Sequence, residues 1–281
     1  MFQSLGGAER YAPESTFCEL ELNGEYQGIY SLGERIKRAE SRLDLDDDGP
    51  VGSTFIVKLD STDGFHDNAV GTGTWQLVFP EADAANEAAV STFLSGWEDA
   101  TRASDPTDLE TGIFAYIDMD SAVDWVLLQE FAKNVDAYQY SVYLWRDAGG
   151  KARFVPWDVD LSMGYPFYDC GATGWLTRLE FVDAMAADPS FRAALVDRWT
   201  LLRQDQLSEA SIFARIEAYD TTLAPGLDEN FERWPIGDIA FATDDVDDWL
   251  CPVDSYEEEH ERVLTFIAER LSWMDENIAS Y

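Results

Sequence analysis

The chain is poor in the residues on which several common kinds of site depend. Among its 281 residues are two histidines, His66 and His260, and three cysteines, Cys18, Cys170 and Cys251. No two cysteines have the close spacing of a zinc-ligand pair, and two histidines offer little material for a histidine-rich metal centre or a Ser-His-Asp triad. An odd cysteine count leaves at least one thiol outside any internal disulfide. A pairing of Cys170 with Cys251 stays open.

Positive charge is also scarce. Lys and Arg total 19 against 55 Asp and Glu, which gives a formal net charge of -36. Such a field repels nucleic acid and anionic lipid, so neither partner is expected, and no apolar run is long enough to span a membrane. Three explanations of the acid excess stay open: solvation in a salty medium, collection of divalent cations, or an acidic composition that is general in the lineage.

What the sequence does contain is enough apolar material for a large core, with 46% hydrophobic and 14% aromatic residues. Its first part has strand signals. Residues 16–35 alternate around Asn23-Gly24, a strong hairpin turn, and 55–59 and 74–79 are further strand candidates. Residues 1–80 are therefore expected to be mainly β.

After Pro80 the apolar spacing becomes helical. A helix capped by Asp120 or Ser121 is expected to end near Lys133. The other expected helices span 85–103, 176–187, 190–207, 208–219 and 256–278. Segregated strands and helices predict an α+β fold. We expect one domain over 1–281, with a β-rich small lobe (1–80) and a mainly helical large lobe (81–281) around a cleft.

The carboxylates most suited to chemistry follow the helix that ends near Lys133. Two short strands, at 138–145 and just before Pro156, can be paired by a turn at Gly149-Gly150. This hairpin would place three carboxylates at the strand ends: Asp136, Asp158 and Asp160. Such groups can hold a divalent cation and accept the proton of a hydroxyl, as phosphoryl transfer requires. Simple turn-forming roles for Asp136 and Asp158 are equally open.

A second set of residues could bind a nucleotide. Lys58, inside an apolar strand, either points outward from an edge strand or reaches phosphates in a cleft. Glu34 is either its ion-pair partner or a surface charge. Trp157 either stacks on a nucleobase or packs in the core.

Calcium binding is a rival interpretation of the acidic loops. Asp44, Asp46, Asp48 and Gly49 match the first half of an EF-hand loop, but Phe55 occupies the position of the final Glu. An exposed acidic turn is therefore favoured. With a second acidic loop at 244–248, a calcium-dependent adhesion module stays open.

Two motifs carry a resemblance to a known family. They are Asn23-Gly-Glu-Tyr-Gln-Gly-Ile-Tyr-Ser-Leu-Gly-Glu34 and Pro156-Trp-Asp-Val-Asp160, supported by the Gln129–Asp136 helix end. With these pieces the chain resembles the CotH (spore coat protein H) kinase family over nearly its whole length. The resemblance implies an atypical protein-kinase-like fold that binds ATP and Mg2+, or Mn2+, and phosphorylates Ser or Thr of secreted or surface proteins.

The resemblance also implies roles for individual residues. Asp136 matches the catalytic aspartate and Asp158 the metal-binding one, with Asp160 in support. Lys58 would contact the phosphates, and Glu34 and Trp157 would complete the nucleotide site.

The chain departs from the family pattern in two ways. The fifth residue after Asp136 is Ser141, where the family commonly has a metal-binding Asn, so Ser141 is expected to be a weaker ligand. Family members also have more strands before the hairpin, so part of the small lobe is expected to be missing. The alternatives are a pseudokinase or a structural surface or spore-coat scaffold without catalysis, and transfer of AMP or phosphorylation of a small molecule on the same fold.

Overall fold

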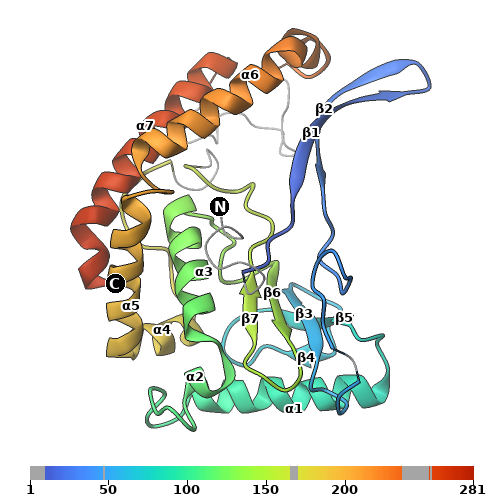
Figure 1. Ribbon diagram of the computed structural model, residues 1–281, viewed down its shortest axis with the longest axis vertical. Helices are drawn as coiled ribbons and strands as arrows, with labels where there is room; N and C mark the ends of the chain where they lie inside the picture. Colours follow the sequence, from blue (N-terminus) through green and yellow to red (C-terminus); the bar gives the residue numbers. More distant parts are fainter. Residues whose placement is uncertain (1–9, 47, 165–169, 236–252, 254) are drawn as a thin grey trace.

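The computed structural model describes residues 10–46, 48–164, 170–235, 253 and 255–281. It is an α+β structure, as the sequence predicted (Figure 1). The strands are β1 (Ser15–Leu22), β2 (Glu25–Gly33), β3 (Phe55–Asp60), β4 (His66–Asp67), β5 (Thr74–Phe79), β6 (Val142–Arg146) and β7 (Arg153–Val155). The helices are α1 (Ala84–Thr101), α2 (Ile113–Tyr116), α3 (Met119–Ala132), α4 (Glu180–Ala187), α5 (Pro189–Arg203), α6 (Glu209–Arg233) and α7 (Tyr256–Asn277), followed by a short 3-10 turn, η4 (Ile278–Ser280).

The first two strands form the predicted hairpin, which stands apart from the larger sheet (Figure 1). Its turn uses Asn23 and Gly24 with φ angles of 55° and 85°, the left-handed conformation that these residue types tolerate. One face of the hairpin packs on α6. There the Ile29 amide donates to Oδ1 of Asn230 over 2.9 Å, so the hairpin is fixed to the helical part of the chain.

The larger sheet is antiparallel, with strand order β4-β5-β3-β6-β7. Strand alternation turns Phe55, Val57 and Leu59 of β3 toward the main core, where all three are fully buried. Ile56, Lys58 and Asp60 share the opposite face. Because β3 lies in the middle of the sheet, the edge-strand interpretation of Lys58 is wrong.

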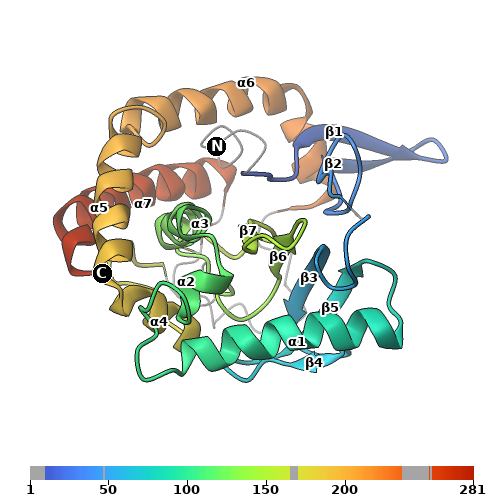
Figure 2. The same cartoon turned by 60° about the horizontal axis from the view of Figure 1, so that its bottom comes forward.

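Helix α1 closes the core side of this sheet (Figure 2). Its Trp97 makes an edge contact with Trp75 at 5.8 Å between ring centroids, and Phe93 does the same with Phe55 at 5.1 Å. Asp83 caps the helix by accepting the amides of Ala85 and Asn86. The helix predicted over 85–103 is confirmed.

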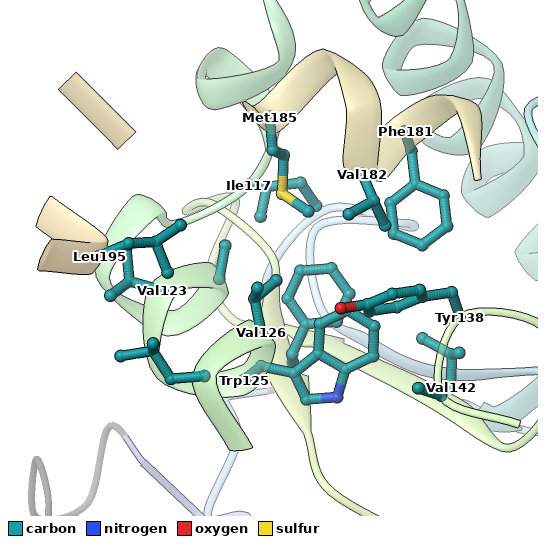
Figure 3. Close-up of a cluster of buried hydrophobic side chains, with 14 of the residues drawn as sticks. Ile117, Val123, Trp125, Val126, Tyr138, Val142, Phe181, Val182, Met185 and Leu195 are labelled. Atoms are coloured by element: carbon teal, nitrogen blue, oxygen red, sulfur yellow. The ribbon is translucent and has the colours of Figure 1, made fainter. Parts of the chain in front are cut away.

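The core continues from α1 to α3 and α4 (Figure 3). Trp125 of α3 stacks on Phe154 of β7, with 4.1 Å between the rings, and meets the edge of Tyr138 at 5.6 Å. Tyr138 lies two residues after Asp136. The segment that carries Asp136 is therefore attached to a rigid aromatic cluster.

The polar face of the sheet is only partly covered. In the connection from β2 to β3, Ile36, Leu43 and Leu45 form a small apolar cluster with Ile56 of β3. Along β3, apolar packing then gives way to the charged side chains of Lys58 and Asp60. The end of this sheet face that carries Lys58 and Asp60 is therefore the part available for a functional site.

Several boundaries differ from the sequence expectation. Helix α3 is capped by Asp118, which accepts the Ser121 amide, rather than by Asp120 or Ser121. Residues 138–141 are not strand, because the amides of Gln139 and Tyr140 bond back to the Asp136 carbonyl and make a turn. Strand β6 therefore begins only at Val142, although its pairing with β7 confirms the predicted hairpin.

The helices after the site are confirmed in kind but not in every boundary. Helix α4 begins at Glu180 rather than near 176, and α6 continues past 219, through Pro225, to Arg233. The short helix α2 and strand β4 were not predicted. Propensity alone does not set such ends, since packing against neighbouring elements decides them.

Cys18 is a free cysteine, whereas Cys170 is disulfide-bonded. Cys251, whose pairing with Cys170 the sequence left open, and the acidic loop at 244–248 lie outside the described residues. No helix in the described part of the chain is both long and apolar enough to cross a membrane.

Candidate functional site

The segment that carries Asp136, called the acidic loop from here on, begins where α3 ends. Lys133 has a φ of 51°, and this left-handed residue turns the chain away from the helix axis. The residue is buried, and its amine donates to the carbonyls of Gly171 and Thr173 over 2.6 and 2.7 Å. Lys133 thus ties the end of α3 to the chain that follows the acidic segment.

Asn134 joins the two acidic segments. Its side-chain amide donates to Oε1 of Gln129 over 3.1 Å and to the carbonyl of Asp158 over 3.2 Å. Its amide oxygen accepts the Asp136 backbone amide over 3.3 Å. Since Asn134 is 2% exposed, this one buried side chain fixes the backbones of both Asp136 and Asp158.

The carboxyl group of Asp136 is half-buried, and its surroundings disfavour its charge. Burial raises its pKa, and the nearby carboxylates of Asp158, Asp160 and Asp60 raise it further. The carboxylates of Asp158, Asp160 and Asp60 are therefore close enough to Asp136 to disfavour its charge. A carboxylate with a raised pKa is a better proton acceptor, and the negative charge around it favours a bound cation.

Ser141 and Asp158 are in direct contact. The Ser141 hydroxyl donates to Oδ2 of Asp158 over 2.8 Å, and both residues have positive φ angles, 54° and 58°. Such conformations are uncommon for non-glycine residues and occur often at functional sites. Asp158 and Asp160 are exposed, so both carboxylates are accessible from solvent.

Lys58 faces this acidic group from β3. It is paired in register with Tyr143 of β6, and its amine forms an ion pair with Asp60 on the same strand face. Burial lowers the pKa of Lys58, but the hydrogen bond and charge of Asp60, with help from Tyr143 and Asp158, raise it overall. Lys58 is therefore protonated and lies within electrostatic range of Asp158.

Asp60 belongs to the site, although the sequence motifs did not mark it as a site residue. It holds Lys58 and contributes to the raised pKa of Asp136. The signal was present in the sequence, because residues two apart on a strand point to the same face. The contacts of Asn134 and Tyr143 depend on the fold, because they join segments that are distant in the sequence.

The structure pairs Lys58 with Asp60 and not with Glu34, so the suggested Glu34–Lys58 ion pair is wrong. Glu34 instead contacts Nε of Arg42 at 3.3 Å and accepts the backbone amide of Glu14. The hydrogen bond from Glu14 is the largest of the effects that lower its pKa. Whether Glu34 helps to bind a nucleotide stays a prediction.

Trp157 lies at the boundary between the apolar cluster and the charged group. It is half-buried, and its ring meets that of Tyr143 at 5.9 Å and 62°. Packing in the small cluster is thus part of its role. Stacking on a nucleobase stays a prediction.

The residues of the site fit a magnesium ion held together with a substrate. In the part of the chain that the structure describes, no three His, Cys, Asp or Glu side chains are grouped as a ready-made metal site. Mg2+ typically takes only one or two carboxylates and completes its octahedron with phosphate oxygens and water. Asp158, with the Ser141 hydroxyl beside it and Asp160 close by in sequence, matches that donor set.

The calcium interpretation gains little from the geometry. Oδ1 of Asp46 accepts the Asp48 amide, and the Asp46 amide donates to Oδ1 of Asp147. Within the described residues these side chains thus serve as turn and loop anchors.

Comparison with known proteins gives a match to one family over nearly the whole chain. The family model described as CotH kinase protein matches residues 1–274 of the chain. A search of the curated proteins found no match.

Proposed function

Because the chain belongs to the CotH kinase family, we propose that it transfers the γ-phosphoryl group of ATP to Ser or Thr side chains of secreted or surface proteins. One observation carries the proposal. Asn134 binds the backbones of Asp136 and Asp158 together, while Lys58 faces them from the sheet. A proton acceptor, a metal ligand and a phosphate-binding cation are the parts that phosphoryl transfer requires.

The proposed arrangement of lobes follows from the same residues. The small lobe would comprise residues 1–80, with Lys58 on its sheet, and the large lobe 81–281, with the acidic loop. Together they would form one kinase-like domain with the nucleotide between them. The direct pairing of β3 with β6 supports the single domain, because one sheet crosses the boundary at residue 80 and joins Lys58 to the chain that carries the acids.

Asp136 would orient the acceptor hydroxyl and take its proton. As the hydroxyl oxygen bonds to the γ-phosphorus, the bond to the β–γ bridging oxygen breaks, and ADP leaves with that electron pair. The raised pKa of Asp136, caused first by burial and then by its acidic neighbours, suits a group that must accept a proton.

Asp158 would hold Mg2+, or Mn2+, with Ser141 and Asp160 in support. When bound, the metal neutralises phosphate charge and helps to align the transferred group. Lys58 would steady the phosphates, and Trp157 and Glu34 would lie nearer the nucleoside. The carboxylates repel ATP when the metal is absent, so we expect activity to depend strictly on a divalent cation.

A radiolabel assay tests the proposal. The chain is incubated with γ-labelled ATP, Mg2+ or Mn2+, and a library of Ser- and Thr-containing peptides. Asp136→Ala and Asp158→Ala are each expected to reduce incorporation by about 10²- to 10⁴-fold. Asp99→Ala, at an exposed position of α1, serves as the matched control and should retain wild-type activity. Mass spectrometry of the product distinguishes addition of phosphate from addition of AMP.

Two observations favour a pseudokinase as the second candidate: Ser141 replaces the family Asn, and Asp60 already neutralises Lys58. A pseudokinase would show a thermal shift with MgATP but no incorporation with either metal. A purely structural scaffold would show neither, and that result would overturn the nucleotide site as well.

A further inference from the structure

The site has too little positive charge for a polyanionic ligand if Lys58 is its sole cation. Lys58 is ion-paired with Asp60, so much of its charge is compensated before any ligand arrives. Asp136 and Asp158 add negative charge on the other side of the site. A nucleoside triphosphate is itself a polyanion. Even with a divalent cation bound, a further positive group is needed for favourable electrostatics.

Arg35 lies beside this site on a fixed piece of backbone. It lies two residues after the end of β2, where the connection to β3 runs down to the larger sheet (Figure 1). The next residue, Ile36, is 2% exposed and packs in the small apolar cluster against which Tyr143 and Trp157 also pack. Burial of Ile36 therefore holds the Arg35 backbone next to the two aromatic side chains that border the site.

Tyr143 connects the segment of Arg35 to the strand of Lys58. It is the register partner of Lys58 in the neighbouring strand. It also packs against the small apolar cluster that contains Ile36, the residue next to Arg35. The backbone of Arg35 therefore lies on the side of the sheet that carries Lys58, with Tyr143 in contact with both segments.

Arg35 differs from the other arginines of the same connection. Arg38 donates to the carbonyl of Leu45 and lies over the ring of Phe79, and Arg42 is paired with Glu34. Arg35 is exposed and, within the described residues, makes no ion pair or hydrogen bond. In a chain with 55 acidic residues, an arginine that no carboxylate engages is available for an anionic ligand.

We propose that Arg35 is a second phosphate-binding cation of the nucleotide site and contacts the phosphate chain of a nucleoside triphosphate beside Lys58. The inference rests on the proposed function, because it needs a nucleotide at this face of the sheet. A guanidinium suits the task, since it remains charged and can donate two parallel hydrogen bonds to one phosphate. Lys58 would supply a point charge from strand β3, and Arg35 would supply a planar guanidinium from the segment between β2 and β3.

Calorimetric titration with MgATP, MgADP and adenosine tests the inference. Arg35→Ala should weaken MgATP binding by about 10- to 100-fold, the range of a charge-assisted hydrogen bond, and leave adenosine binding unchanged. Arg35→Lys should give an intermediate loss, because it keeps the charge without the fork. Arg215→Ala is the matched control. Arg215 is likewise exposed and makes no ion pair within the described chain, but lies on α6, at the opposite end of the molecule from the larger sheet (Figure 1).

The outcomes separate this inference from the proposed function. If wild type binds MgATP and Arg35→Ala binds it equally well, Arg35 has no phosphate role and the kinase proposal is untouched. Equal losses in Arg35→Ala and Arg215→Ala would mean that only the overall charge matters, which also overturns the inference. If wild type binds MgATP without transferring phosphate and only the Arg35 variants weaken, the inference stands while the catalytic proposal falls. A wild-type chain that binds no nucleotide overturns both.

Discussion

The hydroxyl of Ser141 donates to Oδ2 of Asp158 over 2.8 Å, across 17 positions of sequence. The contact brings together the serine expected to be the weaker metal ligand and the carboxylate proposed to hold the metal. Because both residues have positive φ angles, their side chains are presented by strained backbone, which the buried Asn134 helps to hold. Ser141 therefore makes a specific contact within the site, although the family commonly has asparagine at this position.

Substitutions of Ser141 should change metal affinity in opposite directions. Ser141→Ala removes the hydroxyl and should weaken Mg2+ binding roughly fivefold, as expected for loss of about 1 kcal/mol. Ser141→Asn should tighten it, because Asn tolerates a positive φ and its amide oxygen can bind the metal. The measurement is the Mg2+ concentration at half-maximal thermal shift in the presence of ATP. Ser95→Ala, at an exposed site on α1, is the control. Identical midpoints for all four proteins would contradict a metal role for position 141.

The raised pKa of Asp136 predicts how stability depends on pH. Since the folded-state pKa lies above the ordinary value of 3.8, the native state keeps its proton to a higher pH than the unfolded state does. Stability therefore falls as pH rises through the interval between the two pKa values, and the loss persists at neutral pH. Asp136→Asn removes that cost.

Without metal, Asp136→Asn should melt at a higher temperature than wild type at pH 7. The gain should be a few degrees at most, since about 1 kcal/mol corresponds to roughly 2–4 °C for domains of comparable size. It should shrink as the pH approaches 3.8, where wild type is also protonated. Asp99→Asn provides the control. A variant that is less stable than wild type at pH 7 would show that the Asp136 charge is not disfavoured.

Asp60 should restrain Lys58 in the absence of ligand. Asp60→Asn removes the ion pair and frees the amine for phosphate, so MgATP should bind roughly two- to fivefold more tightly. The effect is small because a partly exposed pair is worth only about 0.2–1 kcal/mol. Calorimetry measures it, with the exposed Asp67→Asn on β4 as control. Weaker binding in Asp60→Asn alone would mean instead that Asp60 belongs to the binding machinery.

Arg270 should be among the most costly residues to replace. It is fully buried on α7 and donates to the carbonyls of Glu130, Ala172 and Gly174, with distances from 2.6 to 3.0 Å. Arg270→Met would leave these carbonyls without their donor. Breaking a buried charged contact typically costs about 3–5 kcal/mol.

The expected result for Arg270→Met is a fall in melting temperature on the order of 10 °C. Arg215→Met, at an exposed position on α6, should change it little. Because Arg270 links the end of α3 to the segment after the acids, hydrogen exchange should also rise there first. A fall of only a degree or two would contradict this anchoring role.

Part of the site could be predicted from residue pattern alone. The NGEY hairpin, the strand that carries Lys58 and the helix that ends just before Asn134 all rely on local signals: a turn residue, alternation and a cap. The acids at 136, 158 and 160 also stand out by their place after regular elements. Residues 138–141 were misassigned, because alternation cannot distinguish a strand from a turn whose amides bond back to Asp136.

The sequence by itself determined the α+β class, the order of most elements and the family, because these depend on short-range patterns and on motifs preserved along the chain. Only the tertiary structure decided which charges meet. In the fold, Lys58 forms its ion pair with Asp60 and not with Glu34, and the hydroxyl of Ser141 donates a hydrogen bond to Asp158. The physical reason is that these contacts depend on strand register, sheet order and single left-handed residues, and a shift of one position in any of them would send the side chains elsewhere.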